Sequence, residues 1–228
     1  MITNLSKRIL LSITGEKRVD WKNKLKEVKK LKLKKVALFL ECYSSKERKL
    51  IYAALLNSGI KQIPFVHARY DMKKWEYVFL IKRFKTKYFN LHSDLFKKLK
   101  NLNGIHKKIL LELSYENHLH RNMDLNKIGG FCIDLSHFKA SEERWTNEFE
   151  FVLKKEQFKK YFIANHISGY SYPRKKDLHT IRTLSDFEYL KTLPEFLFGK
   201  YIALEVDNSI KDQIKFKKNI INILKSHD

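Results

Sequence analysis

An apolar run in the middle of the chain ends in an aspartate, and a histidine follows three residues later. The run GGFCID covers residues 129–134 and ends at Asp134, and the histidine is His137. A carboxylate beside a buried strand is costly unless a cation pairs with it or a metal ion binds it. Imidazole and carboxylate ligands together suit Zn²⁺, Mn²⁺ or Fe²⁺. The pair therefore indicates a metal site, provided that other residues of these types meet it in the fold.

Histidines and carboxylates also occur at or just after the ends of other apolar runs. For any one histidine taken alone, a structural role is the more common case. A metal site thus requires a fold that brings several of them together, and five of the nine histidines qualify. Besides Asp134 and His137, the candidate ligands are His67, His92, Glu112, His166, Asp177, His179 and Glu205.

Eight β-prone apolar runs are each followed by a less regular or helical segment, which predicts a series of β–α units. The clearest helix is predicted over 44–59, with serines that can cap its start and a glycine at its end. Another is predicted over 185–199, interrupted at Pro194. This pattern predicts an α/β fold, a (β/α)8 TIM barrel; the alternative, a doubly wound open sheet, usually has a glycine-rich phosphate loop that SITGEKR lacks. The predicted strands are 8–14, 35–42, 62–68, 87–93, 108–114, 130–136, 161–167 and 201–206.

Length and composition predict one domain over residues 1–228, because no Ser/Gly/Pro-rich linker divides the chain. No apolar run approaches the roughly 18 residues that span a bilayer, so we expect neither membrane insertion nor secretion. Cys42 and Cys132 lie in apolar runs and are predicted to be buried thiols in a reducing compartment. We therefore expect a cytoplasmic protein, and a monomer.

In a barrel, active-site residues come from the C-terminal ends of the strands, where the candidate ligands lie. Successive side chains of a strand alternate between the inside and the outside of a barrel. If Asp134 points inward, Cys132 does too; if Glu205 points inward, so does Ala203. The spacing therefore predicts a ring of ligands at one mouth of the barrel.

With these residues in this order, the chain resembles the xylose isomerase-like TIM-barrel superfamily, and within it most closely the endonuclease IV family of apurinic/apyrimidinic endonucleases. The resemblance is clearest from the third to the eighth strand, and its most specific pieces are CIDLSH (132–137), HARY (67–70) and DLH (177–179). It implies a site for two or three divalent metal ions. Zinc is the expected metal, and Mn and Mg are the alternatives. One ion would be held by His67, His92 and Glu112, a second by Glu112, Asp134, His166 and Glu205, and a third by His137, Asp177 and His179.

The resemblance also implies a reaction, which is hydrolysis of DNA 5′ to an abasic site. Glu112, Asp134 and Glu205 would be the catalytic carboxylates, around metal ions that activate water and neutralise the phosphate. Glu116 is an alternative to Glu112 as the ligand from the fifth strand, and the role of Glu41, at the end of the second strand, is open.

Two other functions fit the same residues. A sugar or sugar-phosphate isomerase or epimerase would hold one divalent metal among Glu112, Asp134, His166 and Glu205, and its two glutamates would move protons next to a carbonyl. A non-catalytic barrel would bind a nucleic acid or a protein partner through its basic surface.

The formal net charge of +22 favours a polyanionic partner, although lysine-rich helical faces such as 21–35 account for part of it. Basic and aromatic residues in the predicted active-face loops could contact phosphates or stack on bases, and they would serve abasic DNA or a sugar phosphate equally. The predicted substrate-binding residues are Arg69, Tyr70, Arg174, Lys175, Lys176 and Arg182.

Overall fold

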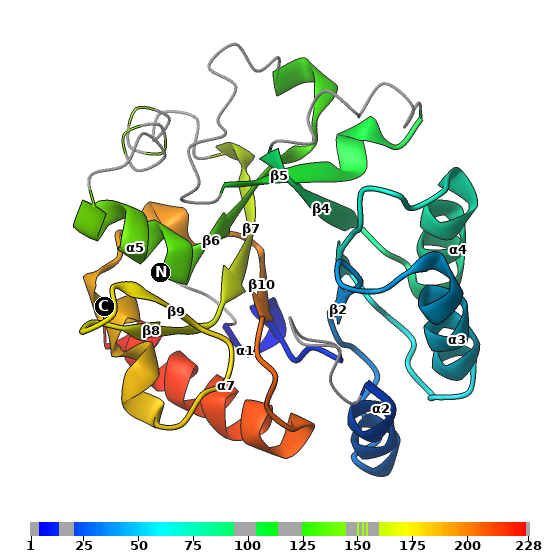
Figure 1. Ribbon diagram of the computed structural model, residues 1–228, viewed down its shortest axis with the longest axis horizontal. Coiled ribbons are helices and arrows are strands. Elements are labelled where there is room, and N and C mark those ends of the chain that lie inside the picture. Colours follow the sequence, from blue (N-terminus) through cyan, green and yellow to red (C-terminus); the bar gives the residue numbers. More distant parts are fainter. Residues whose placement is uncertain are drawn as a thin grey trace.

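The computed structural model describes residues 5–13, 21–93, 104–113, 125–144, 150, 152, 154 and 160–226. An eight-stranded sheet lies at its centre, with the strand order β1-β10-β7-β6-β5-β4-β3-β2 and every pair parallel (Figure 1). Each of the eight predicted runs contains a strand, although β1 and β2 are only two residues long. The strands are β1 (Ile9–Leu10), β2 (Leu38–Phe39), β3 (Phe65–His67), β4 (Tyr88–His92), β5 (Ile109–Leu113), β6 (Gly130–Asp134), β7 (Phe162–Ile167) and β10 (Tyr201–Leu204).

The two edge strands of this sheet come together, so that the sheet curls round on itself. An isolated parallel bridge joins Ser12, just after β1, to Ala37, just before β2. The amide of Ile13 donates to the carbonyl of Ala37 at 3.2 Å, and the amide of Ala37 donates to the carbonyl of Leu11 at 2.7 Å. The architecture is therefore TIM-barrel-like, which confirms the predicted class of fold.

Helices lie around the outside of the sheet (Figure 1). The predicted helix over 44–59 is α3, which begins after the N-cap Ser44 and ends three residues before Gly59, whose φ is +81°. The predicted helix over 185–199 is instead two 3₁₀ segments on either side of Pro194, which has no N–H to continue the first. The α-helices are α1 (Leu5–Arg8), α2 (Trp21–Lys30), α3 (Ser45–Leu56), α4 (Lys74–Phe84), α5 (Leu135–Arg144) and α7 (Ile210–Lys225), and the 3₁₀ segments are η2 (His106–Lys108), η3 (Leu125–Lys127), η5 (Leu184–Thr192) and η6 (Glu195–Leu197).

A short antiparallel hairpin after β7 was not predicted. Its strands are β8 (Gly169–Ser171) and β9 (Lys176–Leu178), and Tyr170 pairs with Asp177. The turn between them contains Lys175 with a φ of +48°. The hairpin matters because it carries Asp177, one of the candidate ligands.

Two apolar layers fill the molecule, one between the sheet and the helices and one inside the curled sheet. The predicted alternation is confirmed, because Cys132 and Ala203 lie in the inner layer and Ile133 and Leu204 lie in the outer one. Cys132 is buried, as predicted, whereas Cys42 is only partly buried. The inner layer consists of Leu10, Ala37, Phe39, Phe65, Leu110, Cys132, Ala164 and Ala203.

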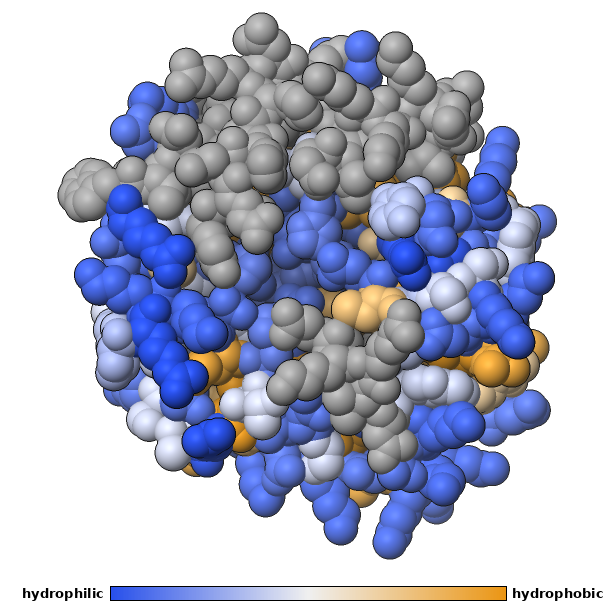
Figure 2. Space-filling view, in the orientation of Figure 1, coloured by the Kyte–Doolittle hydropathy of each residue, from blue (hydrophilic) through white to orange (hydrophobic). Residues whose placement is uncertain are grey.

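The described surface is mostly hydrophilic on the face shown in Figure 2. Among the residues that the structure describes, none of the helices combines the length and apolar character that crossing a bilayer requires.

A buried arginine ties α3 to α4. Arg48 is fully buried, and its guanidinium donates to both carboxylate oxygens of Glu76 at 2.8 and 2.9 Å, to Asp71 at 2.9 Å and to the carbonyl of Tyr43 at 2.8 Å. We expect Arg48→Ala to lower the free energy of unfolding by about 3–5 kcal/mol, because it leaves the buried Glu76 carboxylate without its cation. Urea unfolding of the purified protein measures this change.

Arg83→Ala is the matched control, since Arg83 is an exposed arginine on α4, the helix that carries Glu76. We expect it to change stability by no more than about 0.5 kcal/mol. Equal effects of the two substitutions would contradict the assigned role of Arg48.

Candidate metal centre

The ends of six strands each place a polar side chain directly above the inner apolar layer. In every case the polar residue follows an inward apolar residue at a spacing of two, which keeps it on the same side of the strand. For example, His166 follows Ala164, and Glu112 follows Leu110. The residues placed in this way are Glu41, His67, Glu112, Asp134, His166 and Glu205.

Four of the predicted ligands form a buried cluster that we call the inner group: Glu112, Asp134, His166 and Glu205. Each offers one ligand atom, and these atoms all lie within 4.8 Å of one another. Nδ1 of His166 is 3.0 Å from Oε2 of Glu205 and 3.5 Å from Oε1 of Glu112. The strand register explains this convergence, since Asp134 and Ala203 both pair with His166 across β6, β7 and β10.

The inner group has buried polar atoms that the protein leaves unsatisfied. Oδ1 of Asp134 accepts from the hydroxyl of Ser136 at 2.7 Å and from the amide of His137 at 2.8 Å. Among the described residues, neither Oδ2 of the same carboxylate nor Nδ1 of His166, both buried, has a hydrogen-bond partner. Buried polar atoms are normally paired, so these free lone pairs fit a divalent ion bound by three carboxylates and an imidazole.

Crowding of charge inside the inner group shifts the acidities of its members. Burial opposes ionisation of Glu205, but His166 and His179 outweigh it and lower the pKa of Glu205 to about 2. Burial likewise opposes ionisation of Glu112, yet His166, His67 and His92 bring its pKa well below the usual range. Burial raises the pKa of Asp134, and the charges of Glu205 and Glu112 add to that effect. A cation bound among these carboxylates would relieve their mutual repulsion.

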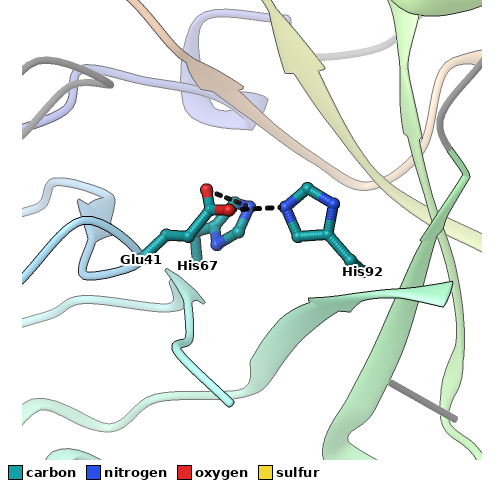
Figure 3. Close-up of side chains that lie close together, drawn as sticks. All are labelled: Glu41, His67 and His92. Carbon is teal, nitrogen blue, oxygen red and sulfur yellow. Dashed lines mark ion pairs between the residues drawn. The ribbon is translucent and has the colours of Figure 1, made fainter. Parts of the chain in front are cut away.

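A second cluster, which we call the outer group, lies beside the first and consists of Glu41, His67 and His92 (Figure 3). Nε2 of His92 is 2.8 Å from Oε1 of Glu41, and Nε2 of His67 is 3.4 Å from Oε2 of Glu41. Glu112 connects the two groups: its Oε2 lies 2.9 Å from Nε2 of His67 and accepts from Nδ2 of Asn90 at 2.5 Å.

The remaining predicted ligands, His137, Asp177 and His179, form a third cluster that we call the hairpin group. Oδ2 of Asp177 is 2.8 Å from Nε2 of His179, and Oδ1 of Asp177 is 3.7 Å from Nε2 of His137. Nδ1 of His179 is 3.1 Å from the carbonyl oxygen of Glu205, so the hairpin group adjoins the inner group. The structure thus brings all nine predicted ligands together in three adjacent clusters.

The predicted substrate-binding residues lie outside these clusters. Tyr70 is 58% exposed, and the guanidinium of Arg69 lies 5.4 Å from its ring centre. Arg174 and Lys175 occupy the exposed turn of the β8–β9 hairpin, Lys176 begins β9, and Arg182 is exposed just before η5. Their role in binding stays a prediction. Glu116, the alternative ligand to Glu112, lies outside the described residues.

Sequence reasoning left Glu41 without a role, although a signal for it was present. Ala37 and Phe39 belong to the inner apolar layer, and Glu41 continues the same alternation. Asn90, which holds Glu112, shows a similar signal because it precedes His92 by two residues on β4. Both residues could have been found by extending the alternation of each strand by one step.

The pKa values of four candidate ligands, His67, His92, His137 and His166, are raised above the ordinary value of histidine, which predicts a pH-dependent affinity for metal. Burial opposes the charged form of His92, but Glu112 and Glu41 outweigh it and raise its pKa from 6.5 to about 10. A metal ion must displace that proton, so the apparent affinity should rise as pH increases from 6.5 toward 10, by about tenfold per unit for each proton released. Calorimetry in two buffers of different ionisation enthalpy measures the protons released, and a count of zero would contradict the prediction.

Comparison with known proteins supports the fold. No family model matches the sequence, and no curated protein matches it either. A solved structure of a D-tagatose 3-epimerase-like protein is 14% identical with a TM-score of 0.50, over 96% of this chain and 98% of that chain. An uncharacterized protein from Parabacteroides distasonis is 13% identical with a TM-score of 0.53, over 97% of this chain and 99% of that chain. The chain therefore has an α/β fold with a curled parallel sheet like that of TIM-barrel proteins.

Proposed function

We propose that this protein is a divalent-metal-dependent isomerase or epimerase that acts on a small sugar or sugar phosphate. The observation that carries the proposal is the inner group, three buried carboxylates and one imidazole at the C-terminal ends of β5, β6, β7 and β10. Active sites of TIM barrels lie at this end of the strands. The similarity of fold to a D-tagatose 3-epimerase-like protein favours sugar chemistry within the xylose isomerase-like superfamily.

Two glutamates of the inner group are placed to move a proton. Glu112 on β5 and Glu205 just after β10 lie on the two sides of β7 in the sheet. Their lowered pKa values keep both ionised at neutral pH, so each can accept a proton from a carbon next to a carbonyl. The carboxyl group that takes the proton can return it to the neighbouring carbon, which gives isomerisation. Return from the other carboxyl, once that group has been protonated from solvent, inverts the same carbon.

A divalent ion held by Glu112, Asp134, His166 and Glu205 would supply Lewis acidity toward the carbonyl and hydroxyl oxygens of the sugar. The protein contributes the orientation of its ligands. Ser136 and the amide of His137 fix one oxygen of Asp134, and Asn90 fixes one oxygen of Glu112.

Phosphodiester hydrolysis at abasic sites in DNA is the second candidate function. The observation that favours it is the presence of the outer and hairpin groups beside the inner group, because an isomerase with one metal needs neither. Several metal ions close together can stabilise both the attacking and the leaving oxygen of a phosphoryl transfer. The net charge of +22 also suits a DNA substrate.

One pair of assays separates the two functions. Protein purified without chelators is incubated in D₂O with a panel of ketoses and aldoses, with and without a terminal phosphate, and proton NMR follows exchange at the carbon beside the carbonyl. A duplex that contains one abasic site is tested in parallel for cleavage. Metal-dependent exchange without cleavage supports the isomerase or epimerase. Cleavage without exchange replaces it with the second candidate, and failure of both refutes the two together.

A further inference from the structure

Glu41 is a carboxylate of the outer group that the proposed reaction does not use. It lies in the turn between β2 and α3, two residues beyond the last residue of β2, and points toward two imidazoles (Figure 3). Its two oxygens face different rings, with Oε1 2.8 Å from His92 and Oε2 3.4 Å from His67. The three side chains come from consecutive strands, β2, β3 and β4, at one end of the sheet.

Each of the two imidazoles directs its Nε2 toward Glu41. Nδ1 of His67 lies 3.3 Å from the carbonyl oxygen of Ala68, a contact that fits a proton on Nδ1. A neutral ring with that proton carries its lone pair on Nε2, the usual arrangement of a metal-binding histidine. Nε2 of His92 is buried and lies 2.8 Å from Oε1 of Glu41. A proton or a metal ion must therefore lie between each of these nitrogen atoms and Glu41, and one divalent ion can take the place of both protons.

Hydrogen bonds fix the backbone on both sides of Glu41. The amide of Leu40 donates to the carbonyl of His67 at 2.9 Å, and the amide of Tyr43 donates to the carbonyl of Leu40 at 3.1 Å. Arg48 then fixes the carbonyl of Tyr43 at 2.8 Å and, through Glu76, ties this turn to α4, the helix that follows β3. These contacts set the position of Glu41 relative to His67. The Glu41 side chain is still 42% exposed, so an ion can reach it from solvent.

We propose that Glu41, His67 and His92 bind a divalent transition-metal ion, with Glu41 as its anionic ligand. Two imidazoles and one carboxylate are a donor set that suits such ions and leaves coordination positions open. Glu112 stands between this ion and the inner group, because its Oε2 faces His67 at 2.9 Å and its Oε1 faces His166 at 3.5 Å. The inference goes beyond the proposed function, which requires the inner group alone.

Cobalt titration of the metal-free protein tests this role of Glu41. Bound Co²⁺ is counted by elemental analysis after gel filtration, and its visible absorption reports the coordination of each ion. We expect Glu41→Gln to bind one Co²⁺ fewer than the unaltered protein, or to bind it at least about tenfold more weakly, a loss that even indirect partners of metal ligands cause. Glu188→Gln is the matched control, because Glu188 is a carboxylate of similar exposure (43%) that pairs with Lys191 on η5.

The outcomes separate this inference from the proposed function. Loss of one ion in Glu41→Gln, together with loss of a different ion in Asp134→Asn, supports two sites and assigns Glu41 to the outer one. An unchanged count and affinity in Glu41→Gln overturns the role of Glu41 while leaving the inner group intact. If Glu41→Gln loses an ion and Asp134→Asn loses none, the outer site stands and the metal requirement of the proposed reaction falls.

Discussion

Replacement of Glu205 by glutamine is expected to lower kcat by about 10³-fold on any sugar that exchanges its proton in D₂O. General acid–base catalysis by a positioned carboxyl group typically contributes about 10²–10⁴-fold, and the amide cannot accept the proton. Glu205 is 7% exposed, and its Oε2 lies 3.0 Å from Nδ1 of His166. Glutamine keeps the shape and one oxygen toward the metal, so the loss should fall on kcat more than on KM.

The control for this experiment is Glu188→Gln, which changes a partly exposed carboxylate on η5 that pairs with Lys191. We expect kcat of that variant to stay within about twofold of the unaltered protein, since surface substitutions away from a site have small effects. Metal content must be measured in both variants. A Glu205→Gln protein that retains its metal and full exchange activity would remove Glu205 from the proposed mechanism.

The fold could be predicted from the sequence because its predicted strands are apolar runs of similar length. Most of them have a histidine, aspartate or glutamate near the end. Buried parallel strands give apolar runs whose alternation identifies the inward side chains, as with Cys132 and Asp134 on β6. The ligands on strand ends could therefore be assigned by spacing alone. Ligands on the β8–β9 hairpin could not, because strands of three residues with a lysine at positive φ in the turn have no such pattern.

The positions of Arg48 and Glu41 could not be predicted because contacts between residues far apart in the sequence determine them. Arg48 lies in the predicted helix over 44–59, and its side chain is buried because it pairs with Glu76 on another helix. Glu41 acquires two imidazole neighbours only when β2, β3 and β4 are adjacent in the sheet. Pairings between residues 26 to 51 positions apart depend on the packed fold, which a local pattern does not encode.

Replacement of Asp134 by asparagine is expected to abolish the stabilisation that the inner metal ion gives the protein. An ion that binds only the folded state raises stability by RT ln(1 + [L]/Kd), about 2.7 kcal/mol at 100 times Kd. Asp134 supplies a buried oxygen that has no partner among the described residues, so its loss should weaken binding of this ion by more than the roughly 10–100-fold that changes in the hydrogen-bond partners of metal ligands cause. Thermal unfolding with and without Zn²⁺ or Mn²⁺ measures the effect.

The same variant distinguishes loss of metal binding from general destabilisation. Without metal, its unfolding temperature should not fall below that of the unaltered protein. Burial raises the pKa of Asp134, which means that the ionised carboxylate is disfavoured at this position without a cation. A neutral amide removes that cost, so metal-free Asp134→Asn should unfold at the same temperature as the metal-free parent or higher. Ser136→Ala, which removes the 2.7 Å hydrogen bond to Oδ1 and the 2.6 Å hydrogen bond with Ser168, should give an intermediate metal response. An unchanged response to metal in Asp134→Asn would show that the inner group does not bind the stabilising ion.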